Sequence, residues 1–355
     1  QDIGEFGGET DNWVWPGHTG DFSFLRAYVA PDGSSAAFAA ENVPYKPKKH
    51  LKVNPNGVNE NDFVFILGYP GKTFRHRPAQ YIAYQQQFLL PYTSELYDFQ
   101  NQQMYAAGKS DPEMALALAT RIKRNANVLK NYRGKLKGLR NIDLISTKKQ
   151  EDTALKNFID QKPELKAKYG SLMSDMDKHY AMVFEEAQKE LWFNNIYSST
   201  RLLRIAGMVN DFKNALAKQN SNKAQEELFN LNSAAFKKQL DAEYESYQLE
   251  VDKNIAQRMF EDAFEFSDKN SIAFIAKRNF AQKSDAAAFV SSSLNNSKLN
   301  AKSVLFNEVL ADVNSLKSYN DDLLELQQEL SDEMRVFNNE QKRREGILNK
   351  LMGDY

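Results

Sequence analysis

The fold class follows from residues 310–337, which read LADVNSLKSYNDDLLELQQELSDEMRVF. Apolar residues recur there at spacings of three, four and once seven: Leu310, Val313, Leu316, Leu323, Leu326, Leu330, Met334 and Phe337. This spacing predicts one face of a single long helix, which could form a local antiparallel coiled coil with a neighbour. The helical pattern continues through residues 346–355.

Proline and glycine divide the sequence into two parts. Seven of the ten prolines and nine of the sixteen glycines precede Ala79, and no proline follows Pro163. Proline lacks a backbone donor and clashes inside helices, so the long proline-free stretch favours helices joined by short polar turns. Asp111 followed by Pro112 predicts a helix start, Pro163 begins another helix, and residues 295–297 interrupt a third helical stretch.

Residues 1–78 favour β structure instead. Phe22–Val29 is rich in aromatic and β-branched residues and is followed by a turn at Pro31–Gly33. The short apolar run Asp62–Leu67 ends at a Gly-Tyr-Pro-Gly turn, which is typical of a buried strand. The sequence therefore predicts two domains, a β-containing domain over 1–78 and a helical domain over 79–355.

The composition excludes several classes of site. The chain has no cysteine, which excludes disulfides, thiolate metal sites and a cysteine nucleophile. The 46 basic and 47 acidic residues nearly balance, so the overall charge indicates no partner. No stretch approaches the ~20 apolar residues of a membrane helix, and we expect no membrane span. Gln1 is not followed by a charged and then apolar leader, and we expect the chain to be a piece of a longer protein.

The four histidines do not indicate a metal site. His18 and Asp21 form a His-x-x-Asp pair, but zinc needs three or four ligands and no second histidine or cysteine lies nearby. We expect His50, His76 and His179 to be surface residues or satisfied core residues. We therefore predict neither a metal nor a cofactor.

The most unusual segment is Phe6–Phe22, which reads FGGETDNWVWPGHTGDF and contains two of the three tryptophans and four glycines. Glycine permits backbone angles that other residues resist, so this segment favours a loop. The loop could be a close-packed structural element. The other interpretation is a substrate loop that projects polar groups between aromatic walls.

This loop carries a resemblance. Residues 6–28, FGGETDNWVWPGHTGDFSFLRAY, resemble the signature of the bacterial dipeptidyl peptidase 7 and dipeptidyl peptidase 11 family of chymotrypsin-like serine dipeptidyl aminopeptidases. Residues 41–48 (ENVPYKPK) and 62–73 (DFVFILGYPGKT) agree with the family in the same order. The resemblance implies a double β-barrel peptidase domain interrupted by a helical domain that caps the cleft. The expected fold is thus mainly α, a large helical domain attached to a partial β-barrel segment.

The resemblance also implies site residues. Asp21 matches the triad aspartate, which accepts a hydrogen bond from the catalytic histidine; the family's histidine and serine stretches do not occur in this sequence. Asn12 and Trp13 match the pair that binds the substrate's free amino group. A helical-domain asparagine contributes to the same subsite, and Asn127 fits its position. The alternatives to it are Asn125 and Asn131. The family usually has arginine where this chain has Gly17, which puts the local geometry in question.

The implied function is release of dipeptides from oligopeptide substrates with a free N-terminus. The resemblance further implies export to the periplasm or cell surface of a Gram-negative bacterium, a homodimer of the full-length protein, and an inactive isolated chain. A non-enzymatic helical scaffold or peptide-binding module is the alternative. Residues 121–149 hold ten basic residues and one acidic residue, which could form a solvated helix face, a cleft attracting anionic peptides, or a nucleic-acid surface. We expect the solvated face, and no nucleic-acid partner.

Overall fold

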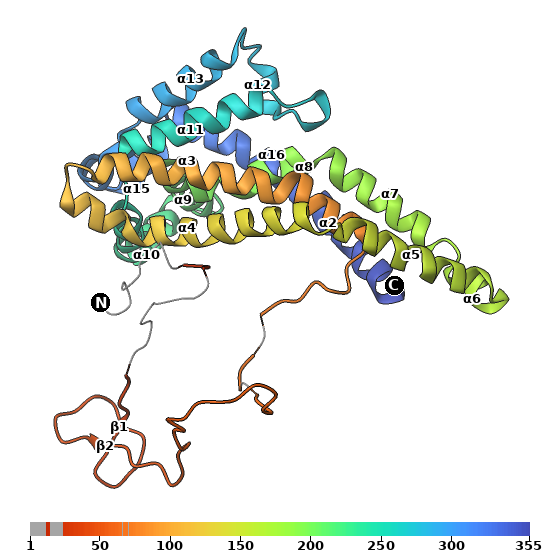
Figure 1. Ribbon diagram of the computed structural model, residues 1–355. Coiled ribbons are helices and arrows are strands. Elements are labelled where there is room, and N and C mark those ends of the chain that lie inside the picture. The colour runs from red at the N-terminus through yellow and green to blue at the C-terminus, as the bar shows by residue number, and fades with distance from the viewer. Residues whose placement is uncertain (1–11, 15–23, 66, 70) are drawn as a thin grey trace. The chain divides into compact units, whose positions relative to one another are not determined.

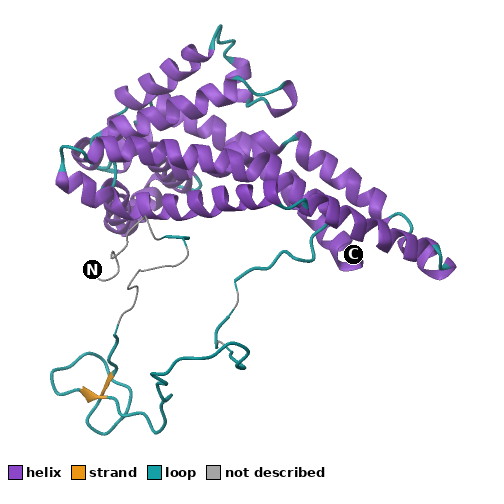
Figure 2. Ribbon diagram, viewed as in Figure 1, coloured by secondary structure: helices purple, strands orange, loops and turns teal. Residues whose placement is uncertain are grey.

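The computed structural model describes residues 12–14, 24–65, 67–69 and 71–355, and it divides the chain into two compact units. The first unit comprises Gln1–His76 and the second Arg77–Tyr355. The second unit is built of helices joined by short connections, whereas the described part of the first is mostly loops and turns (Figures 1 and 2). The mainly α fold class predicted from the sequence is confirmed.

The described part of the first unit contains one sheet of two short strands, β1 (Tyr28–Val29) and β2 (Val43–Pro44). The strands pair antiparallel, with Tyr28 opposite Pro44. A turn follows β1 as predicted, and its Gly33 adopts a φ of 86°, which glycine tolerates because it lacks a Cβ.

The strand predicted at Asp62–Leu67 is wrong for the residues described there. No strand forms at 62–65 or at 67, and 90% of Phe63 and 80% of Leu67 are exposed. A strand is stable when neighbouring strands satisfy its backbone groups and another layer covers its apolar face. No described segment does this for residues 62–65, so the apolar run lies uncovered.

The α-helices of the second unit are α2 (Ala79–Tyr84), α3 (Leu90–Gly108), α4 (Pro112–Asn141), α5 (Leu144–Asp160), α6 (Pro163–Tyr169), α7 (Leu172–Glu185), α8 (Ala187–Ser199), α9 (Arg201–Ala217), α10 (Asn222–Tyr244), α11 (Leu249–Phe264), α12 (Ala273–Lys277), α13 (Lys283–Asn296), α14 (Lys302–Val304), α15 (Val313–Ser318) and α16 (Asp322–Asp354). Two π-helical segments, Gln85–Leu89 and Leu305–Val309, and two 3₁₀ segments, Asp268–Asn270 and Lys298–Asn300, complete it. None of the helices in the described part of the chain has the length and apolar character needed to span a membrane.

The helix ends follow the capping signals of the sequence. The Asp111 side chain accepts a hydrogen bond of 3.0 Å from the Met114 backbone N, and Pro112 is the first residue of α4. Helix α6 begins at Pro163 and α13 ends at Asn296. All three predictions are confirmed. Proline at the first position of α4 and of α6, and the aspartate cap of α4, satisfy local backbone requirements without distant contacts.

The single helix predicted over residues 310–337 is wrong, since the chain there is divided between α15 and α16. It becomes extended at Tyr319, where ψ is 128°, and Asp321 caps α16 by accepting a hydrogen bond of 2.9 Å from the Leu324 backbone N. Asparagine and aspartate side chains compete for backbone partners in this polar run, which favours a break and a new cap. The predicted apolar face is buried on α16 at Leu323, Leu326, Leu330 and Phe337.

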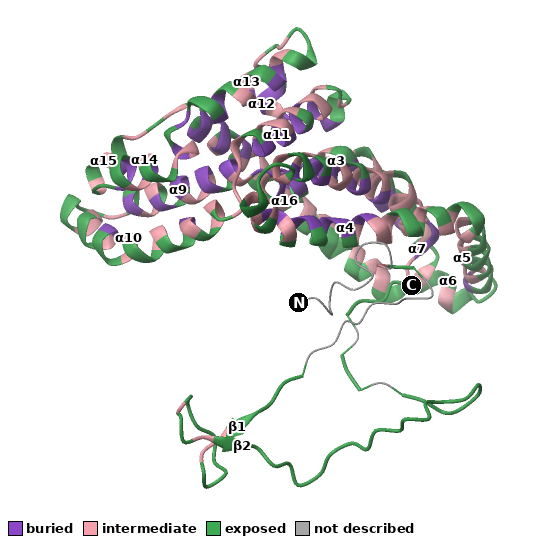
Figure 3. Cartoon of the chain, turned by 60° about the vertical axis from the view of Figure 1, so that its left-hand side comes forward, coloured by how far each residue is buried: buried purple, intermediate pink, exposed green. Residues whose placement is uncertain are grey.

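The core of the second unit lies where α8, α9 and α11 meet. Buried positions are visible along α9 and α11 in Figure 3. Trp192 of α8 is fully buried, and its ring packs edge-on against Phe260 of α11 with centroids 5.7 Å apart. Its indole Nε1 donates a hydrogen bond of 2.7 Å to the Met259 carbonyl oxygen. The large ring is thus both packed and satisfied, as a buried tryptophan requires.

Helices α3 and α4 lie side by side as a long hairpin (Figure 1). Gly108 ends α3, and a Cβ on it would lie only 2.9 Å from the Cα of Ala115 on α4. Real Cβ atoms do not approach so closely, so this turn depends on glycine for the two helices to meet.

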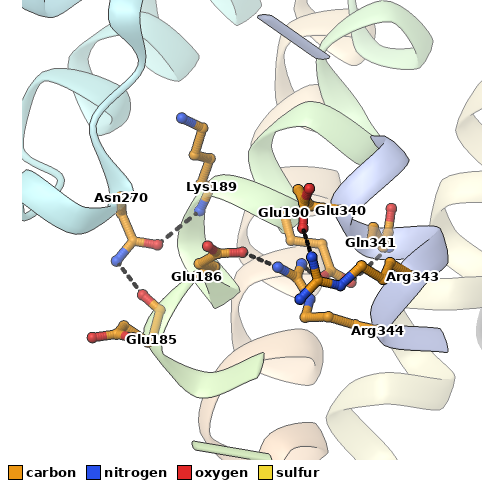
Figure 4. A network of polar contacts seen from close by, with 9 residues as sticks. All are labelled: Glu185, Glu186, Lys189, Glu190, Asn270, Glu340, Gln341, Arg343 and Arg344. Atoms are coloured by element: carbon orange, nitrogen blue, oxygen red, sulfur yellow. Dashed lines mark hydrogen bonds and ion pairs between the residues drawn. The ribbon is translucent and has the colours of Figure 1, made fainter. Parts of the chain in front are cut away.

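Charged side chains join α8 to the second half of α16 (Figure 4). Arg344 forms an ion pair with Glu186, and its Nη2 lies 3.8 Å from an oxygen of the Glu190 carboxylate. Gln341 donates a hydrogen bond of 3.1 Å to that carboxylate. Burial raises the pKa of Glu190, while the charge of Arg344 acts in the opposite direction. This network fixes the end of the long helix α16 against the core.

Candidate functional site

The predicted site residues fall in both units, so each part of the site is described by itself. Asp21 lies outside the described residues, together with Gly17 and His18. The candidates within the described residues are Asn12 and Trp13 of the first unit and Asn127 of the second.

Asn12 and Trp13 form a turn. Trp13 adopts a φ of 61°, in the left-handed region that bulky residues rarely occupy, and 62% of its surface is exposed. Such backbone strain is concentrated at functional sites, where the surroundings hold it in place. The turn thus presents an exposed indole at the residue that follows Asn12.

Asn127 lies on the exposed face of α4. The buried residues of this helix form one stripe: Leu118, Arg121, Ile122, Asn125, Ala126 and Leu129. Because each residue turns an α-helix by about 100°, Asn127 lies opposite the centre of this stripe. Thr120 and Arg124, seven and three residues earlier, are exposed on the same side. The helix therefore presents Asn127 outward.

The alternative asparagines differ in their surroundings. Asn125 is only 1% exposed, and its Nδ2 donates a hydrogen bond of 3.0 Å to Oε1 of Gln100 on α3. Its amide is committed to the core and cannot reach a ligand at the surface. Asn131 is partly exposed and stays an alternative to Asn127.

A buried polar network lies behind the exposed face of α4. Nε2 of Gln100 donates a hydrogen bond of 2.8 Å to the hydroxyl of Ser199 at the end of α8. The Arg121 guanidinium donates to the carbonyl oxygen of the same serine. Gln100, Arg121, Asn125 and Ser199 are all buried, so the network ties α3, α4 and α8 together in the low-dielectric interior, where hydrogen bonds are strong.

Asp252 of α11 completes the charged part of this region. It is 1% exposed and accepts a hydrogen bond of 2.6 Å from the Leu202 backbone N at the start of α9. Burial raises the pKa of Asp252 to about 6, although the neighbouring charge of Arg121 acts to lower it. Burial also lowers the pKa of Arg121.

Sequence reasoning did not identify Gln100, Ser199 or Asp252. One signal was present, because Asp252 precedes Ala256 by four residues and Met259 by seven, so that it shares their buried helix face. A charged residue on such a face needs a partner in the core. The sequence did not reveal which residue that partner was.

A hollow of about 380 Å³ lies beside α4, and Asn127 does not line it. Thr120, Arg121 and Arg124 line it from α4, and Arg201 and Glu245 line it from other segments. Both signs of charge are present, so the hollow suits a polar or charged side chain.

The basic stretch at residues 121–149 does not form one continuous surface. Arg121 is buried, and Arg133 pairs with Asp98 of α3 at 2.7 Å. Asp143 separates α4 from α5 and caps α5 by accepting a hydrogen bond of 3.1 Å from the Ser146 backbone N. The clustered charges of the sequence are therefore divided between the core, an ion pair and two helices.

Within residues 12–14, 24–65, 67–69 and 71–355, no group of three or more His, Cys, Asp or Glu side chains could hold a metal ion. His50 and His76 are exposed. His179 is buried in α7, where burial, together with the charge of Arg344, lowers its pKa.

The chain resembles known peptidases. A family model described as Peptidase S46 matches residues 1–355. A protein of Shewanella putrefaciens named Asp/Glu-specific dipeptidyl-peptidase is 34% identical over 259 residues, which cover 73% of this chain and 35% of that protein. A protein of Capnocytophaga gingivalis named dipeptidyl-peptidase 7 is 34% identical over 257 residues, 70% of this chain and 34% of that protein. The match thus spans about a third of the length of these relatives.

The fold is similar to that of a solved structure, Porphyromonas endodontalis DPP11 in complex with the dipeptide Arg-Glu. The TM-score is 0.77 at 21% sequence identity, and the similarity covers 100% of this chain and 50% of that one. The predicted resemblance to the dipeptidyl peptidase 7 and 11 family is confirmed. Because the family model matches residues 1–355, the chain belongs to the peptidase S46 family.

Proposed function

We propose that the protein containing this chain is a serine-type dipeptidyl aminopeptidase that releases dipeptides from the free N-termini of oligopeptides. The observation that carries the proposal is the family match over residues 1–355, with relatives named dipeptidyl-peptidases. The similar solved structure, which is a complex with a dipeptide, adds support.

The proposal assigns the catalytic histidine and serine to parts of the protein outside this chain, which spans about half the length of the similar structure. It also assigns the first unit to a double β-barrel peptidase domain. Apolar side chains of the first unit are exposed, with 92% of Phe24 and 90% of Phe63 accessible. Burying such side chains is favourable, which supports a covering partner contributed by the rest of a barrel.

Asp21 is proposed as the triad aspartate. It would accept the Nδ1 hydrogen of the histidine, fix its tautomer and stabilise the imidazolium that forms during acylation of the serine. Asp21→Asn in the whole protein should lower kcat by roughly 10⁴-fold, because the amide favours the wrong tautomer. Full activity of this variant would remove Asp21 from the triad.

Asn12, Trp13 and Asn127 are proposed to bind the substrate's ammonium group. The outward position of Asn127, compared with the buried Asn125, supports this assignment. A hydrogen bond to a charged group contributes about 1.5–3 kcal/mol, which corresponds to roughly a 10- to 150-fold change in binding. A blocked amine would lose this interaction and leave acceptors unpaired.

The test compares a fluorogenic dipeptidyl substrate with its N-acetylated form, using the whole protein. Asn127→Ala should lower kcat/KM for the free-amine substrate by about 10-fold or more and leave the acetylated substrate unchanged. Asn141→Ala, at the exposed end of the same helix, is the matched control. Equal cleavage of both substrates by the unmodified protein would contradict an aminopeptidase.

The 355-residue chain alone should be inactive on the same substrate, and hydrolysis by it that survives purification controls would contradict the assigned locations of base and nucleophile. We also propose export to the periplasm or cell surface of a Gram-negative bacterium, checked by cell fractionation. A homodimer of the full-length protein is proposed as well, and light scattering would test it.

A further inference from the structure

We infer that Asn125 is a positioning residue, which fixes the rotation of α4 and thereby sets Asn127 for the substrate's amino group. The inference rests on the proposed function, because it concerns the same amine-binding site. Asn125 itself does not touch a ligand, since it is 1% exposed and lies on the opposite side of the helix.

The contacts of Asn125 form a directional chain through the core. Its Nδ2 donates to Oε1 of Gln100 at 3.0 Å, and Nε2 of Gln100 donates to the Ser199 hydroxyl at 2.8 Å. Arg121, one turn earlier on α4, donates to the Ser199 carbonyl oxygen. Two residues of α4 are thus attached to the end of α8, one directly and one through α3.

This network adds a directional restriction on rotation to that of apolar packing. Leucine and alanine side chains in the same stripe also oppose rotation because the interior is closely packed, but each dispersion contact is small and has little directional preference. A hydrogen bond weakens steeply once its angle departs from linearity. Buried polar groups that lose a partner are costly, so one rotation of α4 is strongly favoured.

The rotation matters because Asn127 lies opposite the buried stripe. A helix with its side chains is about 10–12 Å in diameter, so a group at the surface moves by ~1 Å when the helix turns by ~10°. A misplacement of about 1 Å at a binding or catalytic group can lower activity by roughly 10²-fold. Control of α4 rotation by Asn125 is therefore control of the amine-binding geometry.

The test is a double-mutant cycle with Asn125→Ala and Asn127→Ala in the whole protein. We expect Asn125→Ala to raise KM for the free-amine substrate by roughly 10-fold with a smaller change in kcat, and to leave the acetylated substrate unchanged. In the Asn127→Ala background the same substitution should have little further effect, because the group that it positions is gone.

Two further variants separate positioning from stability. Asn210→Ala removes a buried asparagine of α9, whose Nδ2 donates to the Leu324 carbonyl oxygen at 3.0 Å, and should destabilise the fold without altering the preference for a free amine. Ser199→Ala removes only the hydroxyl that accepts from Gln100. We expect it to show part of the KM increase expected for Asn125→Ala, so it replaces Asn125→Ala in the test if the Asn125→Ala protein does not fold.

The possible results distinguish the two proposals. If Asn127→Ala leaves the free-amine preference unchanged, the amine site assigned above is refuted, and the positioning role with it. If Asn127→Ala is effective but folded Asn125→Ala and Ser199→Ala behave like Asn210→Ala, only the positioning role is overturned. Additive effects of Asn125→Ala and Asn127→Ala would also overturn it.

Discussion

Replacing Asp252 by asparagine should change how the stability of the helical unit depends on pH. Asp252 is 1% exposed and shares the interior with Arg121, and burial raises its pKa from the ordinary value of 3.8 to about 6. In the unfolded chain the same carboxyl is exposed to water and titrates near its ordinary value. Asparagine has nearly the same shape but does not titrate.

The sign and size of this pH dependence follow from proton linkage. Between pH 3.8 and about 6 the folded state binds more protons at Asp252 than the unfolded state, so the free energy of unfolding falls as the pH rises through this window. The stabilisation is fully present below pH 3.8 and is lost above about pH 6. Since one pKa unit corresponds to about 1.36 kcal/mol, the loss is about 3 kcal/mol.

Urea unfolding of the chain, followed by circular dichroism at several values between about pH 4 and 7, measures this effect. The free energy of unfolding of Asp252→Asn minus that of the unmodified chain should rise by about 3 kcal/mol across the window. Asp211→Asn, on the exposed side of α9, is the control for general charge effects. A difference that stays flat over this pH range would refute the reasoning.

Two other substitutions test the packing. Gly108→Ala should destabilise the helical unit by about 1–3 kcal/mol, because the new Cβ would lie 2.9 Å from the Cα of Ala115. The measurement is the melting temperature, which should fall. An unchanged melting temperature would show that the turn can relax. Arg344→Met should cost about 3 kcal/mol in urea unfolding, since its side chain is 11% exposed and its loss leaves the Glu190 carboxylate buried without its cation. Arg343→Met, at a side chain 74% exposed, should cost less than about 1 kcal/mol, and equal costs for the two would contradict the role of burial.

Local chemistry explains which elements the sequence predicted. The cap at Asp111 and the helix start at Pro163 depend on backbone groups within a few residues, so the sequence contains all the information needed. The apolar spacing does not reveal the break at Tyr319, because the spacing continues on both sides of the break. The break is favoured by the neighbouring polar residues, whose side chains compete for backbone hydrogen bonds. The strand prediction at 62–67 is wrong for the residues described there, because pairing requires a partner that the described residues do not provide.

In the candidate site too, the sequence indicates what depends on nearby residues and not what depends on distant ones. The motif around Asn12 and Trp13 is sufficient to indicate the family, and the spacing along the chain indicates the asparagines of α4 as candidates. The sequence already prefers Asn127, and exposure then separates it from Asn125, since the two differ by only two positions but lie on opposite sides of one helix. The sequence gives no signal for Gln100, and for Asp252 it indicates only a buried helix face, because the partners of both residues lie far away along the chain.

The sequence by itself determined that this chain is mainly helical, where several of its helices begin, and which peptidase family it resembles. These properties depend on backbone preferences and short motifs, which act over a few neighbouring residues. Only the tertiary structure decided that Asn125 is committed to the core, that Asp252 is fully buried beside Arg121, and that residues 310–337 are not one helix. Burial and pairing depend on segments that are distant in sequence, and a linear pattern does not specify which of them meet.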